Sequence, residues 1–410
     1  MKGSLRIIYI GKVAPYEPEF YNMPGYGDAG TLAQLGFIEA LYCSGLLDCA
    51  WGFRPIAHWP RVNIQFEKIR RHRLPCGADL HLFPLFNHFL LREISCFSSV
   101  ACCILWWSIC NIGKKRILIT YNLSQPNGVV WARLWTWITH TKLVPIVYDM
   151  AQIKSFKKSF LVRMTEPDWL DRVHEKFLPR CDGLITITDA IIRDFAPKVS
   201  FLRVDGGVGD AVVNRLPLLE RSRCEDKVEN GALILMYAGS LAPWNCVKLM
   251  LDYMVANKGD KRLELWIAGA GSEEEFVREA AANDGRIKFF GMLRQDKLYE
   301  LYSKADVLLN LRDVMDPGVV YHYPSKTFEM LAMGKPTIMS NSAHTKSAYG
   351  DYCKVIDRID VACFAEGVDF FRKMTAEQRF EYGRKARQFI LKHRQWSCWG
   401  SAIGKFLKSI

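Results

Sequence analysis

The chain has 410 residues, of which 50% are hydrophobic and 24% charged, which is typical of a globular protein long enough for two domains. Its net charge of +12 suits nucleic acid, an anionic membrane surface or a phosphorylated substrate, but no zinc-finger or RNA-binding signature supports nucleic acid as a partner. The thirteen cysteines include no Cys-x-x-Cys and no paired Cys/His spacing, which predicts reduced thiols in the cytoplasm and no metal site.

The N-terminal part predicts a strand at residues 6–11, a loop from Lys12 to Ala29 and a helix from about Thr31 to Cys43. Glycines at positions 25, 27 and 30 make this region suited to anion binding or to close backbone approach, and a loop without a ligand is the alternative. Because the loop is not a tight Gly-x-Gly-x-x-Gly turn, we expect no dinucleotide cofactor.

The rest of the first half predicts a parallel, Rossmann-like sheet, because strands alternate with helices. The further strands are predicted at 116–120, 143–148, 182–188 and 201–204, with an aromatic-rich helix around 131–137 and a helix that Asp189 caps. Residues 94–110 are the most apolar run. They fall short of the usual membrane span and follow Arg92 and Glu93, so we predict a buried or interface-lying helix, and a transmembrane helix is the less favoured alternative.

Two basic runs, at 61–73 and 153–163, are candidates for a membrane surface. The second run mixes cations with apolar side chains: Lys154, Lys157, Lys158 and Arg163 with Phe156, Phe160 and Leu161. This mixture predicts peripheral binding to an anionic membrane. The alternative is a solvated charged face, which we favour slightly for the first run.

The second half is more regular and follows a linker at 205–209 and 216–231. Strands are predicted at 232–238, 263–268, 286–290, 307–311 and 337–340, and helices at 247–256, 272–283, 295–303, from Pro324 to Gly334, 376–392 and 396–407. Ser272 is expected to cap the second of these helices, and Pro324 suits a first helical turn.

Ligands of such sheets lie beyond the carboxyl ends of the strands, where several candidate residues follow the predicted strands. These are Gly239, Ser240, Gly269, Gly291, Met292 and Leu293. The helix at Pro324 adds Ser325, Lys326, Thr327 and Glu329. A helix N-terminus and the Lys326 ammonium suit a phosphate, and Glu329 projects from the same face one turn later.

The segment from Pro324 to Pro336, Pro-Ser-Lys-x-Phe-Glu-x-Leu-Ala-x-Gly-Lys-Pro, resembles the donor-binding segment of glycosyltransferase family 4 in a subgroup that reads Pro-Ser-Lys. The resemblance implies the α/β GT-B fold: two Rossmann-like domains, acceptor-binding at 1–215 and donor-binding at 216–393, with a last helix at 394–410 that packs back on the first. It also implies a nucleobase near 291–293, a diphosphate on the Gly239 loop and the Pro324 helix, and a ribose on Glu329. The glycine-rich loop at 25–30 lies over the reaction centre in that family.

The sequence departs from the family pattern at three positions. Tyr321 stands where many members have a first Glu, and Ser240 and Asn245 stand where an Arg and a Lys often bind the diphosphate. Lys326 is the obvious substitute, and Lys248 is a weaker candidate.

The resemblance predicts a retaining, metal-independent hexosyltransferase of polysaccharide biosynthesis that needs no cofactor. It would move a sugar from a UDP- or GDP-linked donor to a glycan or lipid-linked acceptor at the inner face of the membrane. Asp149, at the end of a strand, can orient or deprotonate an acceptor hydroxyl, or simply cap a turn. A nucleotide-sugar epimerase and a non-catalytic binding protein of the same fold are the alternatives.

Overall fold

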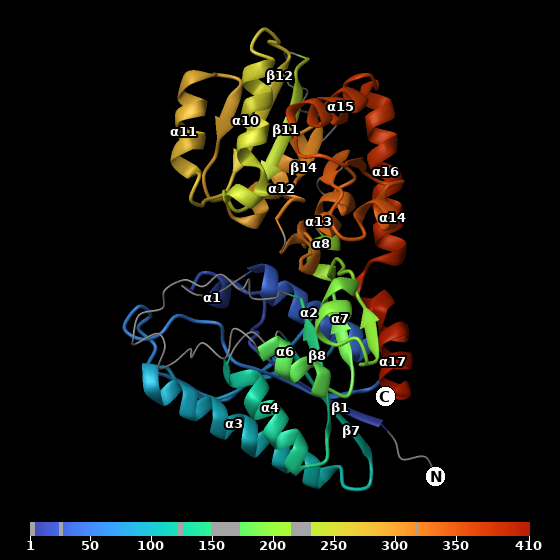
Figure 1. Ribbon diagram of the computed structural model, residues 1–410. Helices are drawn as coiled ribbons and strands as arrows, with labels where there is room; N and C mark the ends of the chain where they lie inside the picture. Colours follow the sequence, from blue (N-terminus) through green and yellow to red (C-terminus); the bar gives the residue numbers. More distant parts are fainter. Residues whose placement is uncertain (1–4, 24–27, 122–125, 149–172, 215–230, 317) are drawn as a thin grey trace. The chain divides into compact units, whose positions relative to one another are not determined.

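The computed structural model describes residues 5–23, 28–121, 126–148, 173–214, 231–316 and 318–410. It divides into two units, one of residues 1–209 with 396–410 and one of residues 210–395 (Figure 1). The predicted domain boundary at 215/216 lies outside the described residues, and the structural division falls between Gly209 and Asp210.

The first unit is built on an eight-stranded sheet with the order β10-β9-β8-β7-β1-β2-β5-β4. Its strands are β1 (Leu5–Gly11), β2 (Leu47–Gly52), β4 (Arg70–Arg73), β5 (Asp79–Leu82), β7 (Lys115–Tyr121), β8 (Lys142–Val147), β9 (Leu184–Thr186) and β10 (Phe201–Arg203). All neighbours are parallel except β4 and β5. The apolar side chains of β1, β7 and β8 are buried on both faces, as expected for a sheet covered by helices on both sides.

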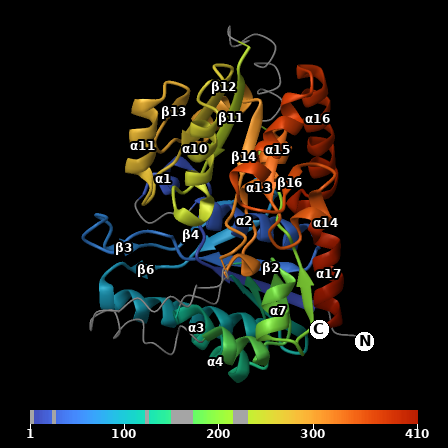
Figure 2. The ribbon, with the colours of Figure 1, turned by 45° about the horizontal axis from the view of Figure 1, so that its top comes forward.

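The helices of the first unit are α1 (Pro18–Tyr21), α2 (Asp28–Cys43), α3 (Phe89–Cys110), α4 (Pro126–Ile138), α6 (Val173–Phe177), α7 (Asp189–Phe195) and α17 (Gly400–Ser409). The short helix α8 (Asp210–Val213) lies at the start of the second unit. A two-stranded ribbon, β3 (Phe66–Glu67) and β6 (Leu85–Phe86), lies beside α3 (Figure 2). The basic run 61–73 is therefore partly strand, because β3 and β4 pair with neighbouring strands.

Two sequence predictions in this unit are wrong in detail. Asp189 does not cap α7: Thr188 is the N-cap residue, and Asp189 lies in the first turn, where it accepts a 2.6 Å hydrogen bond from Arg203. Gly30 does not lie in the loop before α2, because α2 begins at Asp28.

The last segment of the chain packs on α2 of the first unit. Trp396, in the short 3-10 helix Trp396–Trp399, is 4% exposed, and its ring centroid lies 4.8 Å from that of Phe37. A Cβ atom on Gly36 would lie 2.1 Å from the Trp396 ring, so only glycine fits there. Trp399 donates to the Gly206 carbonyl at 2.9 Å.

The second unit is built on a six-stranded parallel sheet with the order β13-β12-β11-β14-β15-β16. Its strands are β11 (Leu233–Ala238), β12 (Leu263–Ala268), β13 (Ile287–Phe289), β14 (Val307–Asn310), β15 (Thr337–Ser340) and β16 (Lys354–Ile356). Numbered within the unit, this is the 3-2-1-4-5-6 order of a Rossmann sheet. The strand order reverses between β11 and β14, and a crevice outside the carboxyl ends of the strands is expected at that point.

The helices of the second unit cover both faces of this sheet. They are α10 (Val247–Ala256), α11 (Glu274–Asn283), α12 (Gln295–Lys304), α13 (Lys326–Ala332), α14 (Thr345–Tyr349), α15 (Val361–Arg372) and α16 (Ala376–His393), with 3-10 turns at Pro243–Asn245 and Val319–Tyr321.

Two of the predicted helix starts in this unit are displaced, those of α11 and α13, whereas α10, α12 and α16 begin at the predicted residues. α11 begins two residues after Ser272, because the Glu273 amide donates to the Leu241 carbonyl of the neighbouring loop at 2.9 Å before the helix starts. Pro324 lies before α13, and its carbonyl accepts from the Thr327 amide at 3.0 Å in a turn that leads into the helix.

Candidate functional site

The Lys326 ammonium lies at the point where the strand order of the second sheet reverses. Its Nζ atom donates a 2.9 Å hydrogen bond to the carbonyl of Ala238, the last residue of β11. The fold thus brings the predicted Lys326 next to the predicted Gly239 loop. A positive charge therefore stands at the carboxyl end of a central strand, where an anionic ligand of a Rossmann sheet is expected.

Three predicted glycines line the same edge of the sheet. The Gly239 amide donates to Ala268 at 3.0 Å, and the Gly269 amide donates to Gly291 at 2.8 Å, so the loops after β11, β12 and β13 are bonded in series. Gly269 has a φ of +140°, and a Cβ atom there would lie 1.8 Å from the Gly239 carbonyl oxygen. Only glycine allows the two loops to approach so closely. Because glycine has no side chain, a ligand can also come close to the backbone at this edge.

Asn245 and Tyr237 hold the Gly239 loop in place by hydrogen bonds to its backbone. Both side chains donate to the Ser240 carbonyl, the Asn245 amide at 2.6 Å and the Tyr237 hydroxyl at 2.8 Å. Asn245 is only 4% exposed, and Ser240 is exposed. At the position where the family resemblance expects a lysine, the chain therefore has a buried amide that holds the loop.

Arg312 is a cation of this edge that the sequence analysis missed. It comes two residues after β14, its amide donates to Ser340 Oγ at 2.7 Å, and the next amide, of Asp313, donates to the Trp244 carbonyl at 2.9 Å. Burial raises the pKa of Cys246 to about 12, and the positive charge of Arg312 opposes that rise. The positive charge of Arg312 is therefore felt at Cys246, in the turn that follows the Gly239 loop. In the sequence, Arg312 could have been noticed as a cation directly after a buried strand. That it belongs to this edge follows only from the strand order, which places β14 next to β11.

Glu329 is half-buried on α13, and its negative charge interacts with Tyr302 of α12. Tyr302 is fully buried, and its hydroxyl has no hydrogen-bond partner among the residues that the structure describes. The pKa of Tyr302 is raised by burial and then by the negative charge of Glu329. Ser325 is exposed at the N-cap of α13, whereas the Thr327 hydroxyl is buried and accepts from Asn310 at 3.1 Å. Thr327 therefore holds α13 against β14 and does not face a ligand.

The other predicted site residues are only partly described. Met292 is 75% exposed, and Leu293 is half-buried after Gly291, which has a φ of +64°. Asp149, Gly25 and Gly27 lie outside the described residues, and Gly30 lies within α2.

Within the described part of the chain, no group of three or more His, Cys, Asp or Glu side chains is placed to hold a metal ion. Asp313 and Asp316, the nearest approach to an acidic pair, bond to backbone amides instead: Asp313 accepts from Met315 at 2.9 Å and Asp316 from Gly318 at 2.8 Å. Both carboxylates shape the turn before α13.

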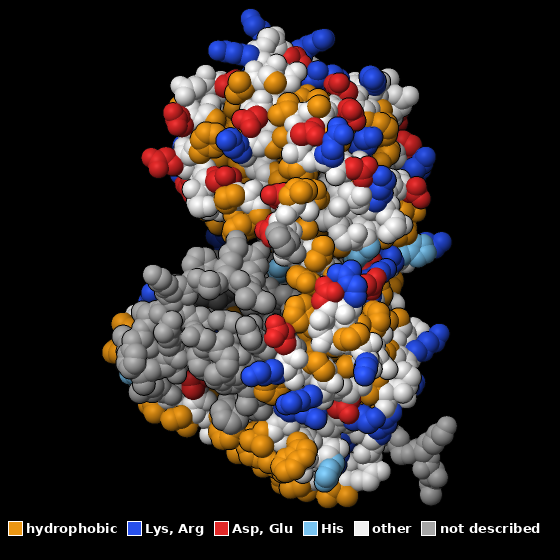
Figure 3. All heavy atoms as spheres, viewed as in Figure 1, with side chains coloured by type: hydrophobic (Ala, Val, Ile, Leu, Met, Phe, Trp, Pro, Cys, Tyr) orange, Lys and Arg blue, Asp and Glu red, His pale blue; other side chains and the backbone are white. Residues whose placement is uncertain are grey.

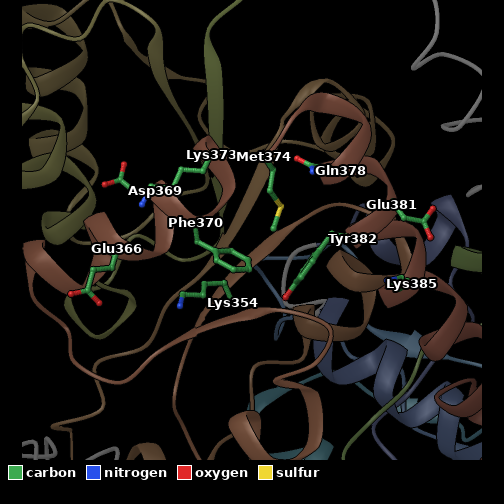
Figure 4. A pocket seen from close by; sticks show the side chains of 10 residues that line it. All are labelled: Lys354, Glu366, Asp369, Phe370, Lys373, Met374, Gln378, Glu381, Tyr382 and Lys385. Carbon is green, nitrogen blue, oxygen red and sulfur yellow. The ribbon is translucent and has the colours of Figure 1, made fainter.

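A groove of about 760 Å³ lies elsewhere in the second unit, between β16, α15 and α16 (Figure 4). Lys354, one of its lining residues, is the first residue of β16, so the groove opens at the amino end of that strand. It is therefore distinct from the carboxyl edge where Lys326 lies. Its lining mixes acidic and basic side chains with the rings of Phe370 and Tyr382.

Comparison with known proteins gives a family match for the second unit. Residues 232–370 match the model of the family described as Glycosyl transferases group 1. No curated protein matches the chain.

Solved structures resemble the chain over nearly its whole length. Sucrose-phosphate synthase from Thermosynechococcus elongatus has a TM-score of 0.64 at 12% identity, covering 98% of each chain. HepE from Anabaena in complex with UDP-glucose has a TM-score of 0.60 at 12% identity, covering 98% of this chain and 100% of its own. A structure described as trehalose-6-phosphate from E. coli, bound with UDP-2-fluoro glucose, has a TM-score of 0.66 at 10% identity, covering 98% and 99%. At these identities the likeness shows the fold, which is GT-B.

Proposed function

We propose that the chain is a glycosyltransferase that takes its sugar from a UDP-linked donor bound at the carboxyl edge of the second sheet. The observation that carries the proposal is the Lys326 ammonium, 2.9 Å from the Ala238 carbonyl at the end of β11. The match of residues 232–370 to the group 1 glycosyl transferases covers this edge. UDP is favoured over GDP because solved structures of this fold hold UDP or a UDP-sugar.

Lys326, together with Arg312 beyond β14, would neutralise the negative charge of the donor diphosphate. In transfer, the bond between the sugar and the diphosphate breaks, and negative charge grows on the leaving phosphate. Fixed cations stabilise that charge without a metal ion. α13 itself adds little, because its seven residues put its negative pole only about 10 Å from its positive pole.

Glu329 would accept hydrogen bonds from the ribose hydroxyls, and the Gly291 loop would carry the base. The finer features come from the family resemblance: retention of the anomeric configuration, independence of metals, and transfer to a glycan or lipid-linked acceptor in polysaccharide synthesis. We place the protein in the cytoplasm at the inner face of the membrane. Asp149 stays a candidate for orienting the acceptor hydroxyl.

A thermal-shift screen of UDP, UDP-sugars, GDP and GDP-sugars tests the donor site. A ligand at 100 times its dissociation constant stabilises the native state by about 2.7 kcal/mol. We expect UDP compounds to raise the melting temperature of the parent chain and to have a much smaller effect on Lys326→Ala. A shift with GDP compounds alone would correct the base, and no shift with any nucleotide would contradict the proposal.

A further inference from the structure

The outer side of α3 carries large apolar residues that the fold leaves uncovered. Leu91, Ile94, Trp106 and Ile109 are 50%, 62%, 70% and 60% exposed. With Ser98 and Cys102, which are also exposed, they recur every three or four residues and form one stripe along the helix. From Leu91 to Ile109 the stripe is about 27 Å long, at a rise of about 1.5 Å per residue.

α4 and the end of α3 widen this stripe into a patch. Leu134, Trp137 and Ile138 of α4 are 37%, 68% and 45% exposed, and Ile112 is 73% exposed. α3 and α4 pack on one another, and Figure 3 shows hydrophobic side chains gathered along the lower edge of the first unit, where Figure 1 places both helices. We call these eight apolar residues (Leu91, Ile94, Trp106, Ile109, Ile112, Leu134, Trp137 and Ile138) the α3–α4 face. A patch of this kind marks an interaction site.

Acidic residues are rare in the segment of the sequence that contains α3 and α4, and Asp48 of β2 contacts α3 through Trp107. Between Asp79 and Asp149 the sequence contains a single acid, Glu93. Glu93 is half-buried, one of its carboxylate oxygens is inaccessible to solvent, and burial raises the pKa of this carboxyl. Exposed Lys68 lies in the loop between β3 and β4, close in sequence to Phe66 of the ribbon beside α3, and Lys114 and Lys115 follow the other end of the helix. The face is thus apolar along its length and flanked by cations.

The inner side of α3 is fastened to the first unit, which argues against a membrane-spanning helix. Residues 91–110 are long and apolar enough to cross a membrane, and only 22% of their most apolar 18-residue window is buried. Arg92, however, donates to the Ile56 carbonyl and to Asn87 at 3.0 Å, and the Trp107 indole donates to Asp48 at 2.8 Å. To span a bilayer, α3 would have to break these buried bonds.

We propose that the α3–α4 face inserts into the surface of a lipid bilayer, with α3 in the plane of the membrane. A typical protein interface carries about ten hydrogen bonds, and this face offers few donors or acceptors for them. Its two exposed tryptophans suit the membrane interface, which accepts an indole ring and its N–H together, and the flanking cations suit anionic headgroups. The inference deepens the proposed function, since it brings the first unit to the surface where a lipid-linked acceptor lies.

This proposal differs from attachment through the basic run 153–163, which lies outside the described residues. A protein that inserts an apolar face still binds neutral vesicles and still binds at high salt. A protein attached only by its cations does not bind neutral vesicles and is released by high salt.

Vesicle co-sedimentation of the full chain without donor or acceptor tests the inference. The vesicles are phosphatidylcholine alone, or phosphatidylcholine with phosphatidylglycerol, each at low and high salt. We expect binding to both, stronger with phosphatidylglycerol. For Ile94→Glu/Trp106→Glu we expect a fall in the partition coefficient of about tenfold or more. The control Val255→Glu/Phe276→Glu makes the same change at two exposed apolar residues of the second unit, 70% and 42% exposed, and should bind as the parent does.

Three results would overturn the inference. One is a folded Ile94→Glu/Trp106→Glu protein that binds as well as the parent, and another is a parent that binds neither kind of vesicle. The third is a parent that dimerises without lipid through this face, shown by light scattering and lost in the variant. Near-ultraviolet circular dichroism and the UDP thermal shift show that the variant is folded, and the shift reports the donor site separately. If the double variant does not fold, Trp106→Ser replaces it under the same criteria.

Discussion

Lys326 has the most specific role of any single residue in this account. In Lys326→Ala we expect the affinity for UDP to fall by about 1.5–3 kcal/mol, the value of a charge-assisted hydrogen bond to phosphate. Isothermal titration with UDP measures the change. Lys346→Ala is a matched control, because Lys346 is an exposed lysine of the same unit that pairs with Asp357 at 2.8 Å. An unchanged affinity in Lys326→Ala would mean that the diphosphate binds elsewhere.

Glu329 is assigned to the ribose, and the isosteric change Glu329→Gln tests that assignment. We expect the parent to bind UDP more tightly than 2′,3′-dideoxy-UDP, because hydrogen bonds to a carboxylate are worth about 1.5–3 kcal/mol. The variant should lose most of this preference, since an amide accepts more weakly. The control Glu300→Gln, which changes a 46%-exposed side chain of α12, should keep this preference. If the variant discriminates as the parent does, Glu329 does not hold the ribose.

Sequence reasoning at this scale identified residues whose chemistry is visible locally. Lys326 stands out in a short motif, and Gly269 follows a buried strand. The sequence did not predict the contacts of Arg312 and Asn245 at this edge, because those contacts depend on which strands are neighbours in the sheet. Tyr302 escaped notice because a tyrosine on an ordinary amphipathic helix gives no sign that its hydroxyl is buried close to the charge of Glu329.

Among the elements, the loops after β11 and β12 approach so closely that a single methyl group should separate them. In Gly269→Ala the new Cβ would lie 1.8 Å from the Gly239 carbonyl oxygen, at a φ that alanine rarely adopts. We expect a loss of about 2–4 kcal/mol in the free energy of unfolding, and weaker UDP binding.

Urea denaturation measures the loss. Gly285→Ala is the control, because nothing lies within 4 Å of its Cβ position and its φ is not in the left-handed region. It should be neutral or slightly stabilising. Equal stability of the two variants would show that the loops at the site do not depend on this contact.

Five of the six strands of the second unit were predicted to within one or two residues, because each is a short apolar run between turn residues, whereas β16 (Lys354–Ile356) was not predicted. The predicted starts of α10, α12 and α16 agree with the structure. The start of α11 is displaced by a hydrogen bond from Glu273 to the neighbouring loop, and the start of α13 is displaced because Pro324 lies in the turn that precedes it. In the first unit β2 and β5 were not predicted. Their burial alternates with exposed or half-buried positions such as Asp48 and His81, and this hides the strand pattern in the sequence.

At the scale of the whole molecule, the chain leaves the first unit at Gly209 and returns to it at Trp396. The buried Trp396 ring fills the space over Gly36, so the return should be essential to that unit. In Trp396→Ala we expect the first unit to lose about 3–5 kcal/mol, as for other buried large-to-small changes.

Calorimetry measures this loss in the full chain. Phe276→Ala removes a 42%-exposed ring from the second unit and should change stability by less than about 1 kcal/mol. If Trp396→Ala unfolds at the temperature of the parent, the terminal segment is only loosely attached.

The central claim is that the chain transfers a sugar from a UDP-linked donor, and the most direct measurement follows radiolabel from UDP-sugars into a lipid-linked acceptor in the presence of EDTA. With fixed cations in place of a metal ion, label should appear in the acceptor fraction, only when acceptor is present, and at an undiminished rate in EDTA. Lys326→Ala should reduce that rate sharply. Conversion of the donor sugar without acceptor would identify an epimerase instead, and activity that EDTA abolishes and Mn²⁺ restores would contradict the mechanism. Nucleotide binding with no turnover of any donor would leave a binding protein and contradict the claim itself.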